Sequence, residues 1–511
     1  MSVTISMNNS SDPISTNAPT YNEETWKQAT TNKLELKDGL SSTSSAIGDD
    51  LPPKPFIRSP TEKALVKKIH YAVLPFVFGC VFIQYADKAV LSAAAVLGML
   101  EDCNVTQTQY SILGSLFYVG FITYQMPNNY LIQRVGSISR YLGTLLVIWG
   151  LVLALTSQAK TFATLAVLRV FLGLFEAATY PCLLIIVNTL YRREEHPKCF
   201  GFLWMSNGFG VIFANLLSYG IAHMDMARNI RAWQWNFIIL GALTILLGIS
   251  VFFLLPDHPH SNRFHLTPEE KIIVDERTQD NAVVRQRKVN YAHYWEAIKE
   301  AQFWLLCFTA LCIQLPNGGL VVFGNPFVKS LGFSSLNAIL LQLPVGTVVV
   351  LYVAFVIYFE HKTKQLVLSA CTTAVISMVG CLLLAVLPHQ PIKLFAYYLS
   401  WAFNGTYAML LTIVGTNVKG YSKKVFYNGG IMIFYTIGSF CGPLMMVSDE
   451  APSYRSGMIG FTVAMFLVVL TLNVSRLWMA RRNMQRKDNH GHTDAHLDHS
   501  DTQDQNFKYR L

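Results

Sequence analysis

Long segments without a charged residue recur along this chain. They lie at 69–86, 110–132, 141–159, 199–222, 233–256, 301–328 and 331–359. A helix needs about 20 mostly apolar residues to cross the hydrocarbon core of a bilayer. The pattern therefore predicts an all-α membrane protein with twelve transmembrane helices. We place these spans at about 72–98, 109–131, 141–159, 163–187, 200–222, 234–255, 303–324, 336–358, 366–387, 393–415, 426–447 and 457–478.

The composition agrees with lipid as the solvent. Of the 511 residues, 52% are hydrophobic and only 14% are charged, and the mean hydropathy is +0.34. A soluble protein carries about 25% charged residues. Buried helices of a large soluble protein are the alternative, but the many uncharged segments of membrane length argue against it. We therefore expect the lipid bilayer as a partner of the chain.

The positive charges lie mainly in loops that an inner N-terminus would place in the cytoplasm. The net charge is +9. Arg134 and Arg140 lie between spans two and three, and Lys423 and Lys424 lie between spans ten and eleven. This distribution fits the positive-inside rule with both ends of the chain in the cytoplasm. Because the basic residues have this explanation, we expect no nucleic acid as a partner.

A polar segment divides the spans into two six-helix bundles. We predict a cytoplasmic tail at 1–68, bundles at 69–256 and 302–479, a central cytoplasmic loop at 257–301 and a second cytoplasmic tail at 480–511. Both tails are polar and are expected to be disordered. Two six-helix halves joined by a long cytoplasmic loop are the plan of the major facilitator superfamily.

The central loop contains two predicted helices. Thr267, Pro268 and Glu270 have the order of an N-cap, a first helical residue and a capping glutamate. This order predicts a short helix that begins after Thr267. A second, amphipathic helix is expected over 294–299, just before span seven.

Four ionisable residues are held inside the predicted spans by their apolar neighbours. They are Asp87 and Lys88 in span one and Arg169 and Glu176 in span four. Each costs about 2.5–3.5 kcal/mol at the centre of a membrane helix, so each needs a partner, water or a function. Sequence neighbours diverge by about 100° around a helix, and residues seven apart lie about 10 Å apart along it. We therefore expect pairing across the two helices, around a shared hydrated cavity.

These charges suggest a coupling mechanism. Our hypothesis is that Asp87 and Glu176 exchange the coupling proton, while Lys88 attracts the substrate anion and Arg169 shapes the electric field. The alternative is a purely structural salt-bridge network between spans one and four, and the sequence leaves that alternative open.

Neutral polar side chains of the C-terminal half would complete the substrate site. The candidates all lie inside predicted spans, and they are Gln314, Asn317, Gln342, Asn404, Tyr407 and Tyr435. Polar residues also bridge membrane helices, and this is the alternative role for each of them.

Five segments resemble signatures of the fungal allantoate permease family, a branch of the anion:cation symporters in the major facilitator superfamily. They are YADK at 85–88, FYVG at 117–120 with PNN at 127–129, RVFLGLFEA at 169–177, LPD at 255–257 with LTPEEK at 266–271, and NVKGYSKK at 417–424. The resemblance covers most of the membrane part, from about 65 to 480.

The resemblance implies a symporter that imports a small organic anion, such as a carboxylate nutrient or a vitamin-like compound, together with protons. It assigns proton coupling to Asp87 and Glu176 and substrate contact to Lys88, with Tyr85 in the same signature. Lys88 stands where many relatives have Arg, so a bidentate grip on a carboxylate is replaced by a point charge. A nutrient sensor of transporter fold, which signals without net transport, is the alternative function.

Other signals are few. Asn104 begins an Asn-Val-Thr sequon on a predicted outer loop and is a candidate glycosylation site. The nine cysteines suggest no disulfide framework. No catalytic triad, nucleotide loop or metal-site spacing is visible, so we expect no enzyme, no cofactor and no metal site. We expect a monomer in the plasma membrane, with the endoplasmic reticulum or another internal membrane as the alternative.

Overall fold

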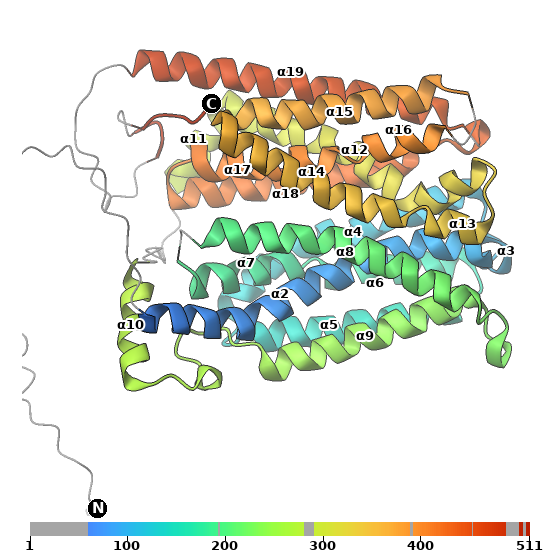
Figure 1. The fold of residues 1–511 in the computed structure, drawn as a ribbon, viewed down its shortest axis with the longest axis horizontal. Helices are drawn as coiled ribbons and strands as arrows, with labels where there is room; N and C mark the ends of the chain where they lie inside the picture. Colours follow the sequence, from blue (N-terminus) through green and yellow to red (C-terminus); the bar gives the residue numbers. More distant parts are fainter. Residues whose placement is uncertain are drawn as a thin grey trace, which may run out of the picture. The chain divides into compact units, whose positions relative to one another are not determined.

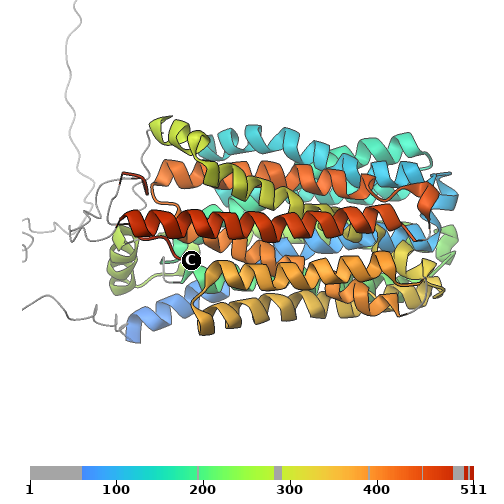
Figure 2. The ribbon, with the colours of Figure 1, turned by 90° about the horizontal axis from the view of Figure 1, so that it is seen from above.

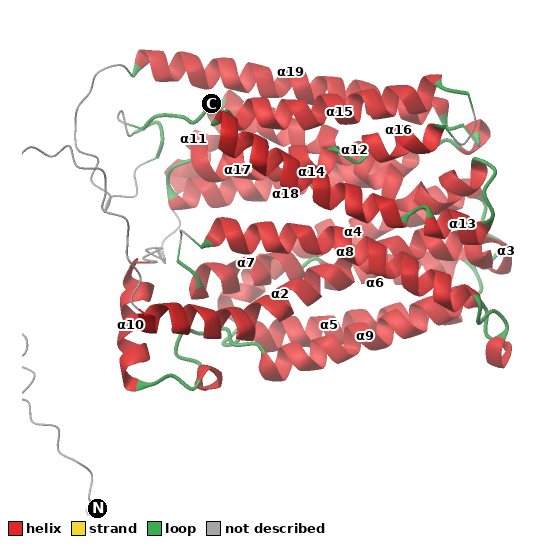
Figure 3. Ribbon diagram, viewed as in Figure 1, coloured by secondary structure: helices red, strands yellow, loops and turns green. Residues whose placement is uncertain are grey.

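The computed structural model of the chain describes residues 60–192, 195–280, 291–388, 392–451, 453–486, 500–503 and 507–511. This part is helical, with turns and loops between the helices and no strand (Figure 3). We call the end near α10 (Pro268–Asp280) and α11 (Tyr291–Lys299) the inner end of the helices (Figure 1). The opposite end, near α13 (Ser335–Leu340), is the outer end. Both names follow the predicted topology.

The N-terminal half of the described chain forms one helical bundle. Its main packing pairs are α5 with α9, α2 with α8 and α4 with α6. The helix α2 continues through a π-helical turn into α3, and α6 and α7 form one interrupted span. The elements are α2 (Pro60–Ala94), η1 (Ala95–Met99), α3 (Leu100–Asp102), α4 (Gln107–Arg134), α5 (Ile138–Leu155), α6 (Phe162–Glu176), α7 (Thr179–Leu190), α8 (His196–Ala222) and α9 (Ala232–Leu254).

The C-terminal half forms a second bundle, in which α12 packs on α18 and α15 packs on α19. The helices of both bundles run along a common direction (Figure 2). Its elements are α12 (Ala301–Ser330), α13 (Ser335–Leu340), α14 (Leu343–Thr363), α15 (Leu366–Val386), α16 (Lys393–Ser400), α17 (Phe403–Asn417), α18 (Tyr421–Leu444) and α19 (Arg455–Gln485).

The twelve predicted spans fall into two groups in the structure, according to whether the matching helix is long and apolar enough to cross a membrane. Eight helical segments of the described chain are long and apolar enough to cross a membrane. The other predicted spans correspond to α4, α8, α18 and the pair α16–α17. The helices α4 and α18 pack on each other, and α8 packs on α14, so α4, α8 and α18 form part of the interface between the two bundles.

The helix predicted after Thr267 is present as α10. The Thr267 hydroxyl accepts the backbone N–H of Glu270 at 3.2 Å, and the Glu270 carboxylate accepts the backbone N–H of Thr267 at 2.9 Å. These two bonds form the capping box that the sequence predicts. The second predicted helix is present as α11 and begins at Tyr291.

The two loop helices belong to different bundles. Arg277 of α10 forms ion pairs with Glu62 of α2 at 2.9 Å and with Glu195, just before α8, at 2.7 Å. Lys68 of α2 adds a pair with Glu270 at 3.0 Å. The loop helix α11 instead contacts α18 and α12. Each half of the molecule therefore carries its own helix at the inner end.

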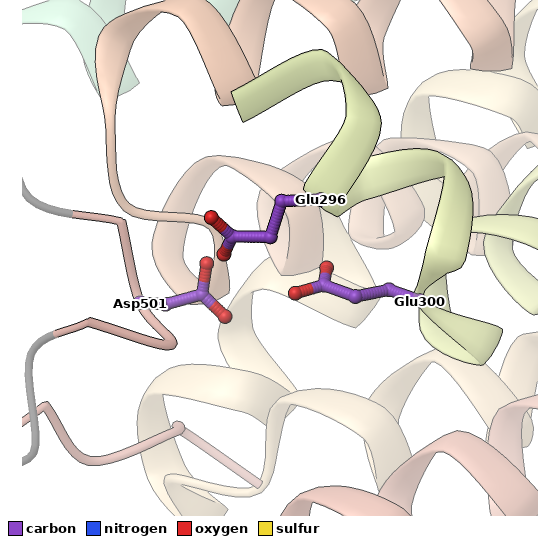
Figure 4. A group of neighbouring side chains, drawn as sticks. All are labelled: Glu296, Glu300 and Asp501. Carbon is purple, nitrogen blue, oxygen red and sulfur yellow. The ribbon is translucent and has the colours of Figure 1, made fainter. Parts of the chain in front are cut away.

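A lysine holds α11 to the C-terminal bundle. Lys423 of α18 is fully buried, and its Nζ lies 2.9 Å from Glu296, 2.5 Å from Glu300 and 2.6 Å from Asp501. Figure 4 shows the three carboxylates pointing toward one another. Three such carboxylates could ligate a metal ion, but here the Lys423 ammonium supplies the positive charge. Burial raises the pKa of Glu300, although the nearby Lys423 acts against this shift.

Part of the second predicted tail is ordered, which corrects the expectation of disorder for 480–511. The helix α19 continues to Gln485, and the described segment 507–511 lies against the inner ends of the C-terminal helices. The Tyr509 hydroxyl donates to Asp501 at 2.6 Å, and the Arg510 backbone N–H donates to Asn417 at 2.7 Å. The polar composition of the tail did not reveal these contacts, because hydrogen-bonding partners such as Asn417 lie on helices that are distant in the sequence.

Replacing the buried lysine tests this assembly. Lys423→Met leaves three carboxylates without their cation, and breaking a buried ion pair in this way costs about 3–5 kcal/mol. We expect the purified, detergent-solubilised variant to unfold at a clearly lower temperature in a thermal melt. Lys299→Met, on the exposed side of α11, is the matched control and should melt like the wild type. Equal melting of both variants would show that the cluster contributes little to stability.

Candidate functional site

One ion pair joins the two charged spans. Lys88 Nζ of α2 lies 2.8 Å from Glu176 Oε1, at the C-terminal end of α6. The Glu176 side chain is 0% exposed and that of Lys88 is 13% exposed. Gly173 lets the backbone of α6 touch that of α4, which leaves room for α6 to lie deep in the bundle. The cross-helix pairing expected from the sequence is thus present for these two residues.

Aromatic rings surround the cation. Lys88 Nζ lies 5.1 Å from the ring centroid of Tyr85 and 5.5 Å from that of Phe117. The face of an aromatic ring attracts a cation, so both rings stabilise the ammonium without neutralising it. Tyr435 of the opposite bundle also lies close enough to interact with Lys88. The lysine therefore keeps its charge next to the space between the bundles.

A cavity lies between the two bundles beside Lys88. Its volume is about 30 Å³, which is room for only one or two water molecules. Side chains of both halves line it, including Tyr85, Lys88 and Asn215 on one side and Asn325, Gln342 and Trp401 on the other. The predicted residues Tyr85, Lys88 and Gln342 thus share one cavity.

Asp87 and Arg169 point elsewhere. Asp87 is fully buried, and its Oδ2 accepts the indole N–H of Trp149 in α5 at 3.0 Å. Arg169 is 3% exposed, lies 5.9 Å from the Phe237 ring of α9, and interacts electrostatically with Asp87. Both charges therefore face the interior of the N-terminal bundle. The expectation that both charges of span one face a shared cavity is wrong, because neighbours on a helix point in different directions.

Two predicted residues of α12 bond to each other near α18. Asn317 Nδ2 donates to Gln314 Oε1 at 2.6 Å, and the Ser439 hydroxyl lies 3.4 Å from the same oxygen. Asn404 donates to the carbonyl oxygen of Trp401 at 3.1 Å. These three amides bond to protein groups, and they do not line the cavity described above.

Two predicted tyrosines form an aromatic contact that reaches across the bundles. The Tyr407 and Tyr435 rings lie 5.3 Å apart, and Trp204 of the N-terminal bundle meets Tyr407 edge to face at 5.6 Å. Asn104 is exposed just before α4, where the sequon's Thr106 caps that helix. Its glycosylation stays a prediction.

Sequence reasoning missed four polar or aromatic residues that line the cavity: Ser92, Asn215, Asn325 and Trp401. One signal pointed to Ser92, which follows Lys88 by four residues and so lies on the same helix face. The others are single polar or aromatic residues in apolar spans, and only the packing of α8, α12 and α16 brings them to the cavity.

Hydrogen bonds close the outer half of the interface between the bundles. The Tyr110 hydroxyl of α4 donates to the carbonyl oxygen of Val322 at 2.6 Å, and the Ser115 hydroxyl donates to that of Phe440 at 2.7 Å. Both donors lie in the first turns of α4, near the outer end. The outer halves of the two bundles are therefore in direct contact, and we call this arrangement outer-closed.

The same two-bundle architecture is found by comparison with known proteins. A model of the Major Facilitator Superfamily matches residues 77–443. The chain belongs to this superfamily. The expected fold, two six-helix bundles of a membrane transporter, is thereby confirmed, and so is the expectation that the protein is not an enzyme.

Curated superfamily members support the resemblance to allantoate permeases. The allantoate permease of Saccharomyces cerevisiae is 28% identical over 83% of this chain and 80% of its own length. The thiamine pathway transporter THI73 of the same yeast is 28% identical over 87% and 86%. The uncharacterized transporter C417.10 of Schizosaccharomyces pombe is 30% identical over 78% and 79%.

Solved superfamily structures share the fold at low sequence identity. A bacterial homolog of the human lysosomal transporter Spinster, in an inward-facing and occupied conformation, has a TM-score of 0.62 and 15% identity. The match covers 85% of this chain and all of that one. A D-xylose-proton symporter has a TM-score of 0.58 and 14% identity, over 79% and 97%.

A glycine contact between the bundles tests the outer-closed arrangement. A Cβ added to Gly208 of α8 would lie 2.6 Å from the carbonyl oxygen of Gly346 in α14. Gly208→Ala should force the bundles apart at a cost of about 1–3 kcal/mol, which lowers the ratio of outer-closed to outer-open molecules by a factor of about 5 to 150. The measurement is the distance distribution between spin labels at the exposed outer residues Glu101 and Ser456.

The matched control lies in the same helix. A Cβ on Gly220 meets no atom within 4 Å, so Gly220→Ala should leave the distance distribution unchanged. Unchanged distances in Gly208→Ala would contradict the idea that this backbone contact defines the outer-closed state.

Proposed function

We propose that this secondary transporter imports a small organic anion together with a proton. Lys88 binds the anion, and Glu176 carries the proton. The observation that supports both roles is the 2.8 Å pair between a partly exposed Lys88 and a fully buried Glu176, beside the cavity between the bundles.

The pair couples the two ligands by competition. In the empty site the ammonium and the carboxylate neutralise each other. An anion that enters the cavity competes for Lys88 and leaves Glu176 without its counter-charge in a dry place. Leaving a buried charge unpaired costs about 3–5 kcal/mol. Protonation of Glu176 removes that cost, so anion and proton bind together.

The same competition for Lys88 also couples the release of the anion to the release of the proton. When the inner side opens, loss of the proton restores the Glu176 carboxylate, which competes again for Lys88 and displaces the anion. The empty site then has no net charge from this pair, and a neutral site returns through the membrane more easily than a charged one. Alternating access of this kind suits two bundles that rock around a central site.

Asp87 receives a different role from the one first expected. Its bond to Trp149 and its interaction with Arg169 lie inside the N-terminal bundle. We assign it to positioning α2, so that the next residue, Lys88, faces the cavity. Arg169 is then the counter-charge that makes this burial tolerable.

The proposed substrate is a small carboxylate, such as a nutrient molecule. A single point charge flanked by aromatic rings suits one carboxylate attached to a small apolar or planar body. Relatives named for allantoate and for the thiamine pathway make allantoate the first compound to test. We place the protein in the plasma membrane as a monomer, in line with its role as an importer.

Neutralising Glu176 tests the coupling. The probes are radiolabelled allantoate, nicotinate, pantothenate and biotin, in cells that lack their own uptake systems. Wild type should accumulate one of them at acidic external pH, and a protonophore should abolish the accumulation. Glu176→Gln mimics the protonated residue, so it should retain exchange of internal for external anion but lose accumulation and pH dependence. Lys88→Gln should weaken anion binding by about a hundredfold.

Controls separate the possible outcomes. Glu101→Gln, an exposed outer carboxylate, should transport like the wild type. Glu176→Gln with normal pH-driven accumulation would refute the proton role. Wild-type protein that binds an anion but never accumulates it would favour the sensor function instead.

A second variant separates Asp87 from the coupling. Asp87→Asn leaves the buried Arg169 without its counter-charge, so we expect a loss of about 3–5 kcal/mol in stability and less protein in the membrane. Uptake per folded molecule should keep the pH dependence of the wild type. Loss of pH dependence in a variant that melts normally would return the proton to Asp87.

A further inference from the structure

Two buried polar atoms at the cavity have no hydrogen-bond partner in the described chain. They are Oδ1 of Asn325, on α12, and Nε2 of Gln342, just before α14. Asn325 is 2% exposed and Gln342 is 4% exposed, so water outside the protein does not satisfy them. Both residues line the same cavity as Lys88. Leaving such a buried polar atom unpaired costs about 1–3 kcal/mol.

The other polar atoms of these side chains are in use, which fixes the orientation of both amides. The Tyr397 hydroxyl donates to Gln342 Oε1 at 3.0 Å, so the Gln342 amide nitrogen remains as a donor. Asn325 Nδ2 lies 3.4 Å from Asn215 Oδ1, so the Asn325 carbonyl oxygen remains as an acceptor. The cavity that Lys88 lines therefore offers one further N–H donor and one C=O acceptor.

A contact with α2 places Asn325 about one helical turn from Lys88 along that helix. The Asn325 backbone N–H donates to the Ser92 hydroxyl at 2.8 Å. Ser92 lies one helical turn beyond Lys88, which is roughly 6 Å farther toward the outer end. A ligand that contacts Lys88 and Asn325 together is larger than the present cavity of about 30 Å³, so it enters while the bundles are apart.

From this geometry we propose that Asn325 and Gln342 form a second subsite that binds a carboxamide or ureido group of the substrate. The substrate N–H donates to Asn325 Oδ1, and the substrate carbonyl accepts from Gln342 Nε2. This subsite rests on the proposed function, because it selects among the anions that Lys88 attracts.

The subsite also links binding to closure. Asn325 belongs to the C-terminal bundle, while its partners Ser92 and Asn215 belong to the N-terminal bundle. A substrate amide bound to Asn325 is therefore held where the two bundles meet. A substrate without that amide leaves the carbonyl of Asn325 unpaired when the bundles close. Sites that bury a hydrogen-bonding group reject analogues that cannot pair with it.

Two ligands of the same shape test the subsite. N-carbamoyl-β-alanine carries a carboxylate, a two-carbon spacer and a ureido group, and 5-methylhexanoate replaces the ureido group with hydrocarbon. Binding to the purified full-length protein in nanodiscs is measured for both at acidic pH. Wild type should prefer the ureido acid by at least tenfold. Asn325→Leu and Gln342→Met should each reduce this preference severalfold while 5-methylhexanoate binds as before or more tightly.

Two controls keep the failure of the subsite distinct from the failure of the proposed function. Asn473→Leu removes an exposed amide of α19 and should keep the wild-type preference. Lys88→Gln should weaken both ligands equally. If wild type binds both ligands alike, or if it binds other carboxylates but neither of these, the subsite is refuted and the role of Lys88 stands. If no anion binds in a Lys88-dependent manner, the proposed function fails and the subsite fails with it.

Discussion

The pairing of Lys88 with Glu176 is the interaction on which the central site depends. Each charge alone would be costly in the middle of a membrane helix, and each makes the other tolerable. The pair is also asymmetric, since one partner borders the cavity and the other is sealed. In the proposed mechanism, that asymmetry gives an incoming anion access to the cation but not to the carboxylate. A symmetric, fully buried pair would hold helices together and do nothing more.

The outer and inner ends of the molecule contain different kinds of polar contact. Near the outer end, hydroxyl groups of α4 donate to backbone carbonyls of the opposite bundle. Near the inner end, ion pairs tie α10 to the N-terminal bundle and α11 to the C-terminal bundle. Hydroxyl–carbonyl bonds between neutral groups are individually weak, about 0.5–1.5 kcal/mol each, and can break and form during a cycle. The buried ion pairs within each half are stronger and keep each bundle intact as it moves.

Much of this arrangement could be predicted from the sequence. Segment length and missing charges indicated the spans, and Thr267 with Glu270 indicated α10 and its capping box. The pairing across spans one and four followed from the diverging directions of neighbouring side chains. The same rule should have warned that Asp87 and Lys88 cannot both face one cavity. Which of them does so depends on the rotation of α2, and hydrophobic periodicity does not fix this in a helix buried on several sides.

The partners supplied by distant segments could not be predicted. Asn325 and Gln342 line one cavity with Ser92 and Lys88 only because α12 and the start of α14 meet α2 there. Asp501 lies in a polar stretch whose composition is typical of disorder, yet it reaches Lys423 together with two glutamates. Charges and amides in a single sequence reveal that partners are needed, but the partners themselves follow from tertiary packing.

The Lys423 cluster connects the beginning and the end of the C-terminal half. The chain of this half starts at α11 with Glu296 and Glu300, passes through the whole bundle, and comes back at Asp501 to the same ammonium. These ion pairs act like a covalent cross-link, because they keep the two chain ends from separating. They thereby reduce the conformational entropy of the long chain segment between those ends. Because its two chain ends are held together, the bundle resists fraying. Its helices can therefore tilt together as one rigid body.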